Sequence, residues 1–132
     1  MPNDFSLLIL KPDAIARGLG DEIERGITSV GLSIIIRQNV TFDIGMLKAF
    51  YNWDVIYEPS VLEEYLCGAQ SIIWIVRGVD AILKCLTYKR SLRMAMRLDR
   101  VHTLLHCSDS LADFNREYRA IFGEDFTIIP ND

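Results

Sequence analysis

Phe5-Ser6-Leu7-Leu8-Ile9-Leu10-Lys11-Pro12-Asp13 is the stretch that decides the fold, because an apolar run of strand length ends at charged residues and a proline. The run predicts a buried β-strand over residues 4–10. Pro12 disfavours the helical conformation for the residue before it, so Lys11 is expected to stay extended at the end of the strand. Ligands commonly bind at that edge of an α/β layer, and a lysine there is a positive point charge suited to phosphate.

The length and composition around this stretch indicate one ordinary folded domain over residues 1–132. Half of the residues are hydrophobic and 24% are charged, which excludes disordered and low-complexity classes. The run over residues 5–10 is too short for a membrane span and no basic region precedes it, so we expect a cytoplasmic protein without a membrane anchor. Three widely spaced cysteines indicate reduced, packed thiols rather than a disulfide framework or a zinc site.

Alternating strand and helix patterns follow the first strand. Further strands are predicted at residues 32–42, 71–76 and 101–106. Five helices are predicted. The first runs from residue 21 to Gly31, the second follows the capping residue Asp43, and the third runs from the capping box of Ser60 and Glu63 to Gly68. The fourth has its apolar face at Val79, Ile82, Leu83 and Leu86 and runs into the basic stretch, and the last follows the capping residue Ser110. This order predicts an α+β sandwich, with the helices packed on one side of a four-stranded sheet.

The charge is unevenly distributed along the chain. Residues 84–100 contain six basic residues and one acid, a net charge of +5, which leaves −9 for the rest of a chain of net charge −4. A globally basic nucleic-acid binder is therefore not expected. The basic stretch suits a wall that faces a small anion such as phosphate, although a solvated helix face would have the same composition.

His106 is the candidate catalytic residue, because it ends an apolar strand and a capped helix begins directly after it. Free amides and the positive end of the helix dipole favour anions at such a position. Glu117, two turns into that helix, could hold one imidazole nitrogen and leave the other as a nucleophile. Metal binding by His102 and His106 is the competing use, and it lacks a third ligand at suitable spacing.

Two separated motifs resemble the nucleoside diphosphate kinase family over about residues 4–122. Leu10-Lys11-Pro12-Asp13-Ala14-Ile15-Ala16-Arg17-Gly18 resembles the start of the family, and His106-Cys107-Ser108-Asp109-Ser110 resembles its active-site signature, with cysteine where glycine is usual. Tyr51, Arg93 and Glu117 match a family tyrosine, arginine and glutamate of the active site.

The resemblance implies a ferredoxin-like α/β sandwich with a four-stranded antiparallel sheet. It implies transfer of the γ-phosphate of a nucleoside triphosphate to a nucleoside diphosphate through a phosphohistidine on His106, with Mg²⁺ carried on the nucleotide. By the same resemblance, Lys11 and Arg93 neutralise the transferring phosphoryl group and Tyr51 supports it. Ser108 hydrogen-bonds Glu117, and Glu117 orients His106.

The sequence departs from the family between Gly78 and Arg93, where the long loop that helps to hold the nucleotide is missing. A second phosphate-binding arginine of the family aligns near Leu86, and Arg90, one helical turn later, is expected to replace it. Thr103 stands in the place of an asparagine that contacts the sugar, so we expect poor discrimination between ribonucleotides and deoxyribonucleotides. Because the loop usually closes trimers, a homodimer paired along strand 32–42, which could assemble into tetramers, is expected instead.

The alternative class is a non-catalytic nucleotide-binding or interaction module that keeps the same fold. The joint presence of His106, Lys11, Tyr51, Arg93 and Glu117 argues against it, since a module without chemistry has no need to keep them together. An RNA-binding sheet module lacks both aromatic stacking residues on its strands and a basic charge balance. The leading hypothesis is therefore a phosphotransferase acting on nucleotides.

Overall fold

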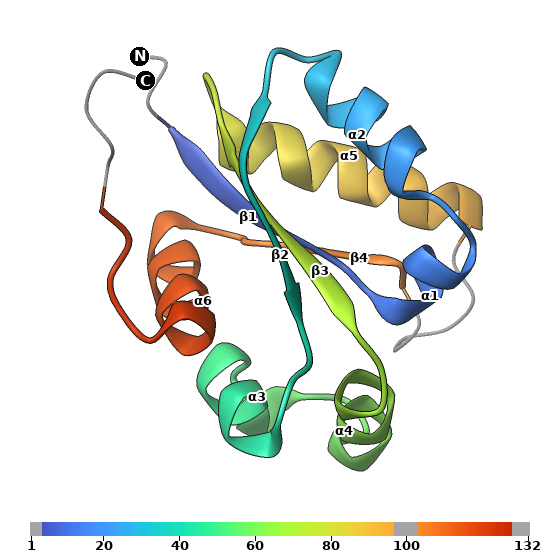
Figure 1. Cartoon of the computed structure of the whole chain (residues 1–132), viewed down its shortest axis with the longest axis vertical. Helices are drawn as coiled ribbons and strands as arrows, with labels where there is room; N and C mark the ends of the chain where they lie inside the picture. The colour runs from blue at the N-terminus through green and yellow to red at the C-terminus, as the bar shows by residue number, and fades with distance from the viewer. Residues whose placement is uncertain (1–3, 97–102, 128–132) are drawn as a thin grey trace.

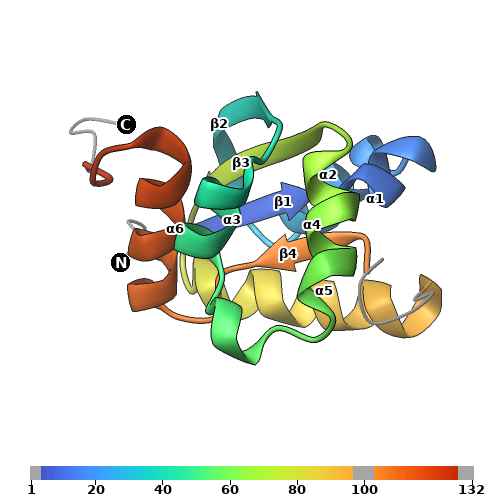
Figure 2. The same ribbon diagram turned by 90° about the horizontal axis from the view of Figure 1, so that it is seen from below.

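β1 (Phe5–Leu10) lies in the middle of a four-stranded antiparallel sheet with the strand order β2-β3-β1-β4 (Figures 1 and 2). It pairs with β3 (Ser71–Arg77) on one side and with β4 (Leu105–Cys107) on the other, and β2 (Ser33–Val40) pairs with β3. The computed structural model describes residues 4–96 and 103–127. The first and last strands of the chain are thus neighbours in the sheet.

The helices cover both faces of this sheet, and not one face as the sequence predicts (Figure 1). Leu8 and Leu10 point to a core formed with α1 (Pro12–Ala16), α2 (Gly20–Thr28) and α5 (Ala81–Met96). Leu7 and Ile9 point to a second core formed with α3 (Ile44–Phe50), α4 (Pro59–Cys67) and α6 (Leu111–Phe122). Side chains alternate between the faces of a strand, so a strand covered on both faces is apolar at nearly every position. The ferredoxin-like α+β fold is confirmed.

Helix ends set by local hydrogen bonds agree with the prediction. Asp43 Oδ1 accepts a hydrogen bond of 2.8 Å from the Met46 amide and begins α3, and Ser110 Oγ accepts one of 3.1 Å from the Asp113 amide and begins α6. The predicted capping box of Ser60 and Glu63 is wrong. α4 begins at Pro59, whose fixed φ and missing amide hydrogen suit the first position of a helix, and Glu58 precedes it with φ +49°.

Three further details differ from the sequence prediction. Pro12 begins the short helix α1, which was not predicted. α5 buries Ala81, Cys85, Leu86 and Leu92, whereas Leu83, predicted on the inner face, is 61% exposed. The last strand is shorter than predicted and places His106 at its centre instead of at its end. Residues 101 and 102, including His102, lie outside the described residues.

The structure also bears on the predictions about thiols and membranes. Cys85 and Cys107 are buried free thiols and Cys67 is a partly buried one, as the sequence predicts. Within residues 4–96 and 103–127, no helix combines the length and the apolar character needed to cross a bilayer.

Candidate active site

His106 projects from β4 onto the face of the sheet that α3 and α6 cover. Its neighbours in the strand, Leu105 and Cys107, belong to the core on the opposite face, as the alternation of a strand requires. The imidazole packs against the edges of two rings at the end of α3, with centroid distances of 4.9 Å to Phe50 and 5.6 Å to Tyr51. The side chain of His106 is 13% exposed and therefore keeps a narrow opening to solvent.

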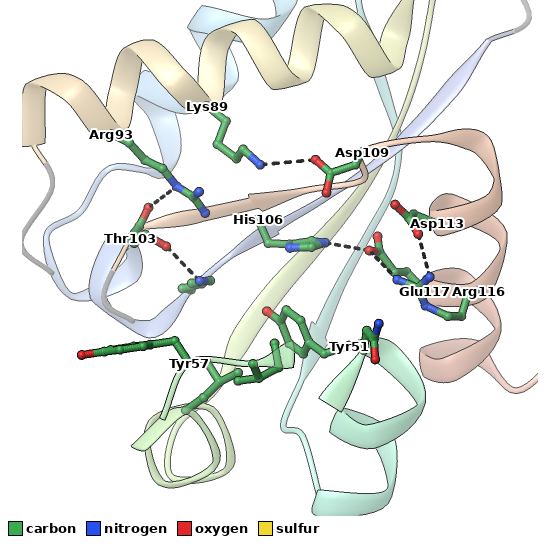
Figure 3. Close-up of a pocket in the computed structure, with 14 residues that line it drawn as sticks. Tyr51, Tyr57, Lys89, Arg93, Thr103, His106, Asp109, Asp113, Arg116 and Glu117 are labelled. Carbon is green, nitrogen blue, oxygen red and sulfur yellow. Dashed lines mark hydrogen bonds and ion pairs between the residues drawn. The ribbon is translucent and has the colours of Figure 1, made fainter. Parts of the chain in front are cut away.

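Glu117 lies behind the imidazole because α6 starts directly after β4 and runs back past it (Figure 3). Glu117 Oε2 is 3.1 Å from His106 Nε2, and Ser108 Oγ donates a hydrogen bond of 2.6 Å to Glu117 Oε1. Nε2 is buried, and its approach to Oε2 lacks the alignment of a full hydrogen bond. Such contacts in unliganded sites commonly tighten when the substrate binds.

The surroundings of His106 favour the neutral imidazole. Burial lowers the pKa of His106 below its usual value of 6.5, and the charges of Lys11 and Lys89 lower it further. Glu117 acts in the opposite direction and raises it. A neutral ring keeps a lone pair on one nitrogen, which is the form of imidazole that can act as a nucleophile.

Lys11 and Arg93 both hydrogen-bond Thr103, which ties the two cations to the segment before β4. The contact between Arg93 and Thr103 is drawn in Figure 3. Lys11 is only 5% exposed, and its Nζ donates a hydrogen bond of 3.0 Å to Thr103 Oγ1. Arg93 donates from Nε to the carbonyl of Thr103 at 3.3 Å and from Nη2 to that of Leu105 at 2.7 Å. Burial lowers the pKa of Arg93, but an arginine remains charged.

Leu104 holds this segment in an unusual turn, with φ at +71°. Its carbonyl accepts a 2.9 Å hydrogen bond from the Lys11 amide, and its amide donates one of 3.1 Å to Asp13 Oδ2. The hydroxyl of Tyr65 in turn hydrogen-bonds both the carboxylate and the amide of Asp13. A left-handed conformation is unfavourable for leucine and persists where surrounding contacts enforce it, which is common at functional sites.

His106 opens into a pocket of about 460 Å³. It brings together six of the residues predicted for the site: Lys11, Tyr51, Arg93, Thr103, His106 and Glu117. Ser108 is fully buried and hydrogen-bonds Glu117, but it does not itself line the pocket. Sequence reasoning missed other polar residues of the lining, namely Asn52, Tyr57, Lys89, Asp109, Asp113 and Arg116.

Arg90 does not face the pocket, contrary to the prediction that it replaces the missing arginine. It is exposed, and Lys89 lines the pocket in its place. Successive residues of a helix point about 100° apart, whereas residues four apart share a face, so Lys89 lies on the same side of α5 as Arg93. The side chain of Lys89 is 12% exposed, and its Nζ lies 3.9 Å from Asp109 Oδ1.

The electrostatics of the remaining polar groups follow from burial. Burial lowers the pKa of Lys89, while the nearby charge of Asp109 raises it. Burial also raises the pKa of Tyr51, so its phenol keeps its proton and can donate a hydrogen bond. The described residues contain no group of three or more histidine, cysteine, aspartate or glutamate side chains that could hold a metal ion.

A largely buried histidine backed by a carboxylate, in a pocket with four basic side chains, is an arrangement suited to a phosphotransferase. The family model of nucleoside diphosphate kinase matches residues 4–126. The chain therefore belongs to the nucleoside diphosphate kinase family and is an enzyme of the kinase class.

Similar curated proteins and solved structures agree with this assignment. The chain is 31% identical to a nucleoside diphosphate kinase of Thermosipho africanus, over 91% of this chain and 89% of that protein. It is 29% identical to a nucleoside diphosphate kinase of Thermococcus kodakarensis, over 89% of this chain and 75% of that protein.

The fold matches the nucleoside diphosphate kinase of Aquifex aeolicus with a TM-score of 0.75 at 20% identity, over 89% of this chain and 93% of that one. It matches an NDP kinase of Pyrobaculum aerophilum with a TM-score of 0.69 at 22% identity, over 90% of this chain and 95% of that one.

Proposed function

We propose that this protein transfers the γ-phosphate of a nucleoside triphosphate to a nucleoside diphosphate through a phosphohistidine on His106. The observation that carries the proposal is the placement of the largely buried His106, with one ring nitrogen 3.1 Å from Glu117, inside a pocket that Lys11, Lys89 and Arg93 also line. The family is the second support, because its relatives are named for this kinase activity.

In the first half-reaction, the lone pair of His106 Nδ1 forms a bond to the γ-phosphorus. The bond from that phosphorus to the β,γ-bridging oxygen breaks, and its electron pair leaves with the nucleoside diphosphate. Glu117 holds the Nε2 proton and stabilises the positive charge that develops on the ring. In the second half-reaction, a terminal β-phosphate oxygen of another diphosphate attacks the phosphorus and the nitrogen–phosphorus bond breaks. His106 thereby returns to its starting state.

The basic side chains of the pocket neutralise the phosphate oxygens during both steps. Lys11 and Arg93 are held by Thr103, which fixes their positions before substrate arrives. The protonated phenol of Tyr51, beside His106, supports the transferring phosphoryl group as a hydrogen-bond donor. Mg²⁺ enters as part of the substrate, bound to the nucleotide phosphates, where it offsets their charge.

Tyr57 is the candidate contact for the base. It lines the pocket with Ile56 and Leu62, and it is 53% exposed, as expected for a residue at the mouth. Every base has a π-face, so an aromatic ring offers stacking that tolerates different bases. This arrangement suits an enzyme that accepts several nucleotides.

Labelling with γ-³²P-ATP tests the proposed function. We expect acid-labile, base-stable label on the protein, which unlabelled nucleoside diphosphates remove as labelled triphosphates. Protein that binds nucleotide but takes no label would contradict the proposal and favour the non-catalytic binding module.

We expect Lys89, and not Arg90, to contribute to phosphate binding. Lys89→Met should lower kcat/KM for diphosphate acceptors about tenfold, because a charge-assisted contact to phosphate is lost. Arg90→Met is the matched control, since Arg90 is the adjacent, exposed cation of α5. It should change kcat/KM by less than about twofold. A larger loss of kcat/KM in Arg90→Met than in Lys89→Met would contradict this prediction, because it would mean that phosphate contacts the face of α5 that carries Arg90.

Thr103 should act mainly on the cations, because its hydroxyl accepts the hydrogen bond of Lys11. Thr103→Val keeps the shape and removes this contact, so kcat/KM should fall about tenfold for ribose and deoxyribose diphosphates alike. Thr103→Asn adds amide donors and should raise the weak preference for one sugar. Paired kcat/KM values for both sugars check this. If Thr103→Val instead changed the ratio of kcat/KM between ribose and deoxyribose diphosphates, Thr103 would be a contact of the sugar.

The assembly and the cellular location stay predictions. β2, the strand expected to pair two subunits, lies at one end of the strand order, and most of its residues are exposed or partly exposed. That geometry is compatible with a homodimer, or a tetramer built from dimers. The cytoplasmic location expected from the sequence is likewise proposed.

A further inference from the structure

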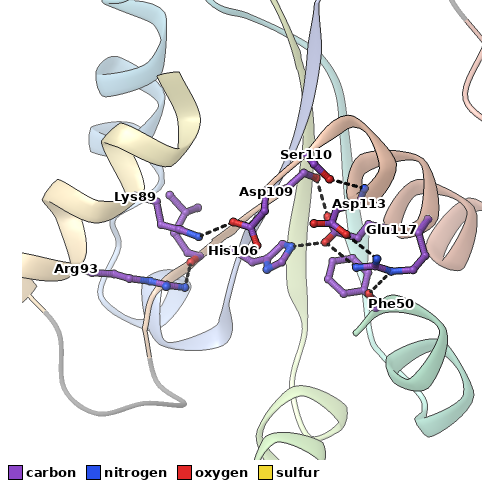
Figure 4. Close-up of polar contacts among 11 residues, drawn as sticks. Phe50, Lys89, Arg93, His106, Asp109, Ser110, Asp113 and Glu117 are labelled. Atoms are coloured by element: carbon purple, nitrogen blue, oxygen red, sulfur yellow. Dashed lines mark hydrogen bonds and ion pairs between the residues drawn. The ribbon is translucent and has the colours of Figure 1, made fainter. Parts of the chain in front are cut away.

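All three nitrogens of the Arg116 guanidinium group contact the protein around His106. Their partners Phe50, Asp113 and Glu117 lie together on one side of His106 (Figure 4). Nε donates a 3.2 Å hydrogen bond to the carbonyl of Phe50, and Nη1 donates one of 2.6 Å to Asp113 Oδ1. Nη2 lies 3.6 Å from Glu117 Oε2, the same oxygen that faces His106. A planar guanidinium that is engaged at each nitrogen is held rigidly, although 45% of the side chain is exposed.

The contact with Glu117 places a full positive charge beside a buried carboxylate. Glu117 is only 3% exposed, and a buried charge is costly unless an opposite charge and hydrogen bonds compensate it. Ser108 supplies a hydrogen bond without a charge. Arg116 is therefore the residue of α6 that brings a positive charge to the Glu117 carboxylate.

The contact with Phe50 fixes the other wall of the histidine site. Phe50 is the last residue of α3, and its ring lies edge-on to the imidazole. Tyr51 follows it immediately and also contacts His106. One side chain of α6 thus holds both the carboxylate behind His106 and the end of the helix that carries its aromatic neighbours.

From this geometry we propose that Arg116 is a positioning residue, which holds Glu117 and the end of α3 in place and so orients His106 as the nucleophile. The inference rests on the proposed phosphohistidine function. Arg116 acts through Glu117 and Phe50, and no contact with substrate is part of the proposal.

Loss of Arg116 should make the site sensitive to acid. Arg116 lies beside Glu117. The other charged and titratable groups around His106 are Lys11 after β1, Lys89 and Arg93 from α5, Tyr51 after α3, Asp109 after β4 and Asp113 from α6. Removing the positive charge of Arg116 makes His106 take up a proton at higher pH. A proton on the ring removes the lone pair of the nucleophile, so the loss of rate should grow as the pH falls.

The test measures the rate of label transfer from γ-³²P-ATP to the protein in a single turnover, across the range from about pH 5.5 to pH 9. Arg116→Gln should be slowed about tenfold near pH 6 and less than about twofold near pH 8.5. Arg116→Lys keeps the charge and should retain the pH profile of the wild type. Arg119→Gln is the matched control on the same helix, because Arg119 is 71% exposed and pairs only loosely, at 3.6 Å, with Asp125.

Recovery of Arg116→Gln at high pH would also show that the variant is folded. An Arg116→Gln profile equal to the wild type would overturn the inference, as would a loss of the same size at every pH, which indicates a plain structural or substrate-binding role. NMR titration of the His106 ring in the unliganded proteins tests the role of Arg116 without catalysis. The midpoint of this titration should move to higher pH in Arg116→Gln and stay at the wild-type value in Arg116→Lys and Arg119→Gln. A wild type that takes no label while this midpoint still moves would overturn the proposed function and leave the positioning role standing.

Discussion

His106→Ala should take no phosphate from γ-³²P-ATP, and its overall transfer rate should fall by at least about 10⁴-fold, because removal of a nucleophile leaves only binding and charge stabilisation. The fold should survive, since the imidazole fills a site beside Phe50 and Tyr51 that is partly open to the pocket. Acid-labile label and steady-state transfer are the two measurements.

The chain provides its own control, because it contains two histidines. His102→Ala should label and turn over at close to the wild-type rate. Acid-labile label on His106→Ala, or an inactive His102→Ala, would place the nucleophile elsewhere on this segment. The pH profile of the wild type adds a second check. Because the pKa of His106 is lowered, the labelling rate should stay flat at neutral pH and fall only below the usual histidine value of 6.5.

Glu117→Gln should slow phosphoryl transfer by about 10²-fold, because the amide keeps the size of the side chain but no longer offsets the charge on the ring. Ser108 can still hydrogen-bond an amide oxygen in place of Oε1, so the local structure should hold. We expect the loss in kcat with little change in KM, since Glu117 lies behind His106 and the phosphates bind at the cations.

Asp113→Asn is not a suitable control here, because Asp113 binds Arg116 and lines the pocket. Glu124→Gln, beyond the end of α6, is a better match for a carboxylate-to-amide change. It should leave both kinetic constants unchanged. Equal activity of Glu117→Gln and the wild type would mean that the imidazole is oriented by its aromatic neighbours alone.

Features that depend on a few consecutive residues could be predicted from the sequence. Asp43 and Ser110 cap helices because the hydroxyl or carboxylate that begins each helix needs only the amide three residues later. Ser60 failed as a cap although its pattern with Glu63 is equally good, because Pro59 had already started the helix. Two local signals competed at that point, and the proline prevailed through its fixed backbone angle.

The rotation of α5 could not be predicted in the same way, because its apolar repeat runs into basic residues and includes Leu83, which is exposed. Lys89 and Arg90 are adjacent cations, and only the packing of Cys85 and Leu92 against the sheet decides which one enters the pocket. The contacts between site residues could not be predicted for another reason, namely that they join residues far apart in the sequence. The hydrogen bond from Lys11 to Thr103 joins positions 92 residues apart, and that from Arg116 to Phe50 joins positions 66 apart.

The pairing of β1 with β4 therefore governs when the candidate site is assembled during folding. Lys11 emerges near the start of the chain and Thr103 near its end, and they meet only after the first and last strands have paired across everything between them. Closing so long a loop has an entropic cost that must be met before the contacts it brings can form. Helices will therefore form before the pocket does, and return of phosphoryl transfer on refolding reports completion of the whole domain.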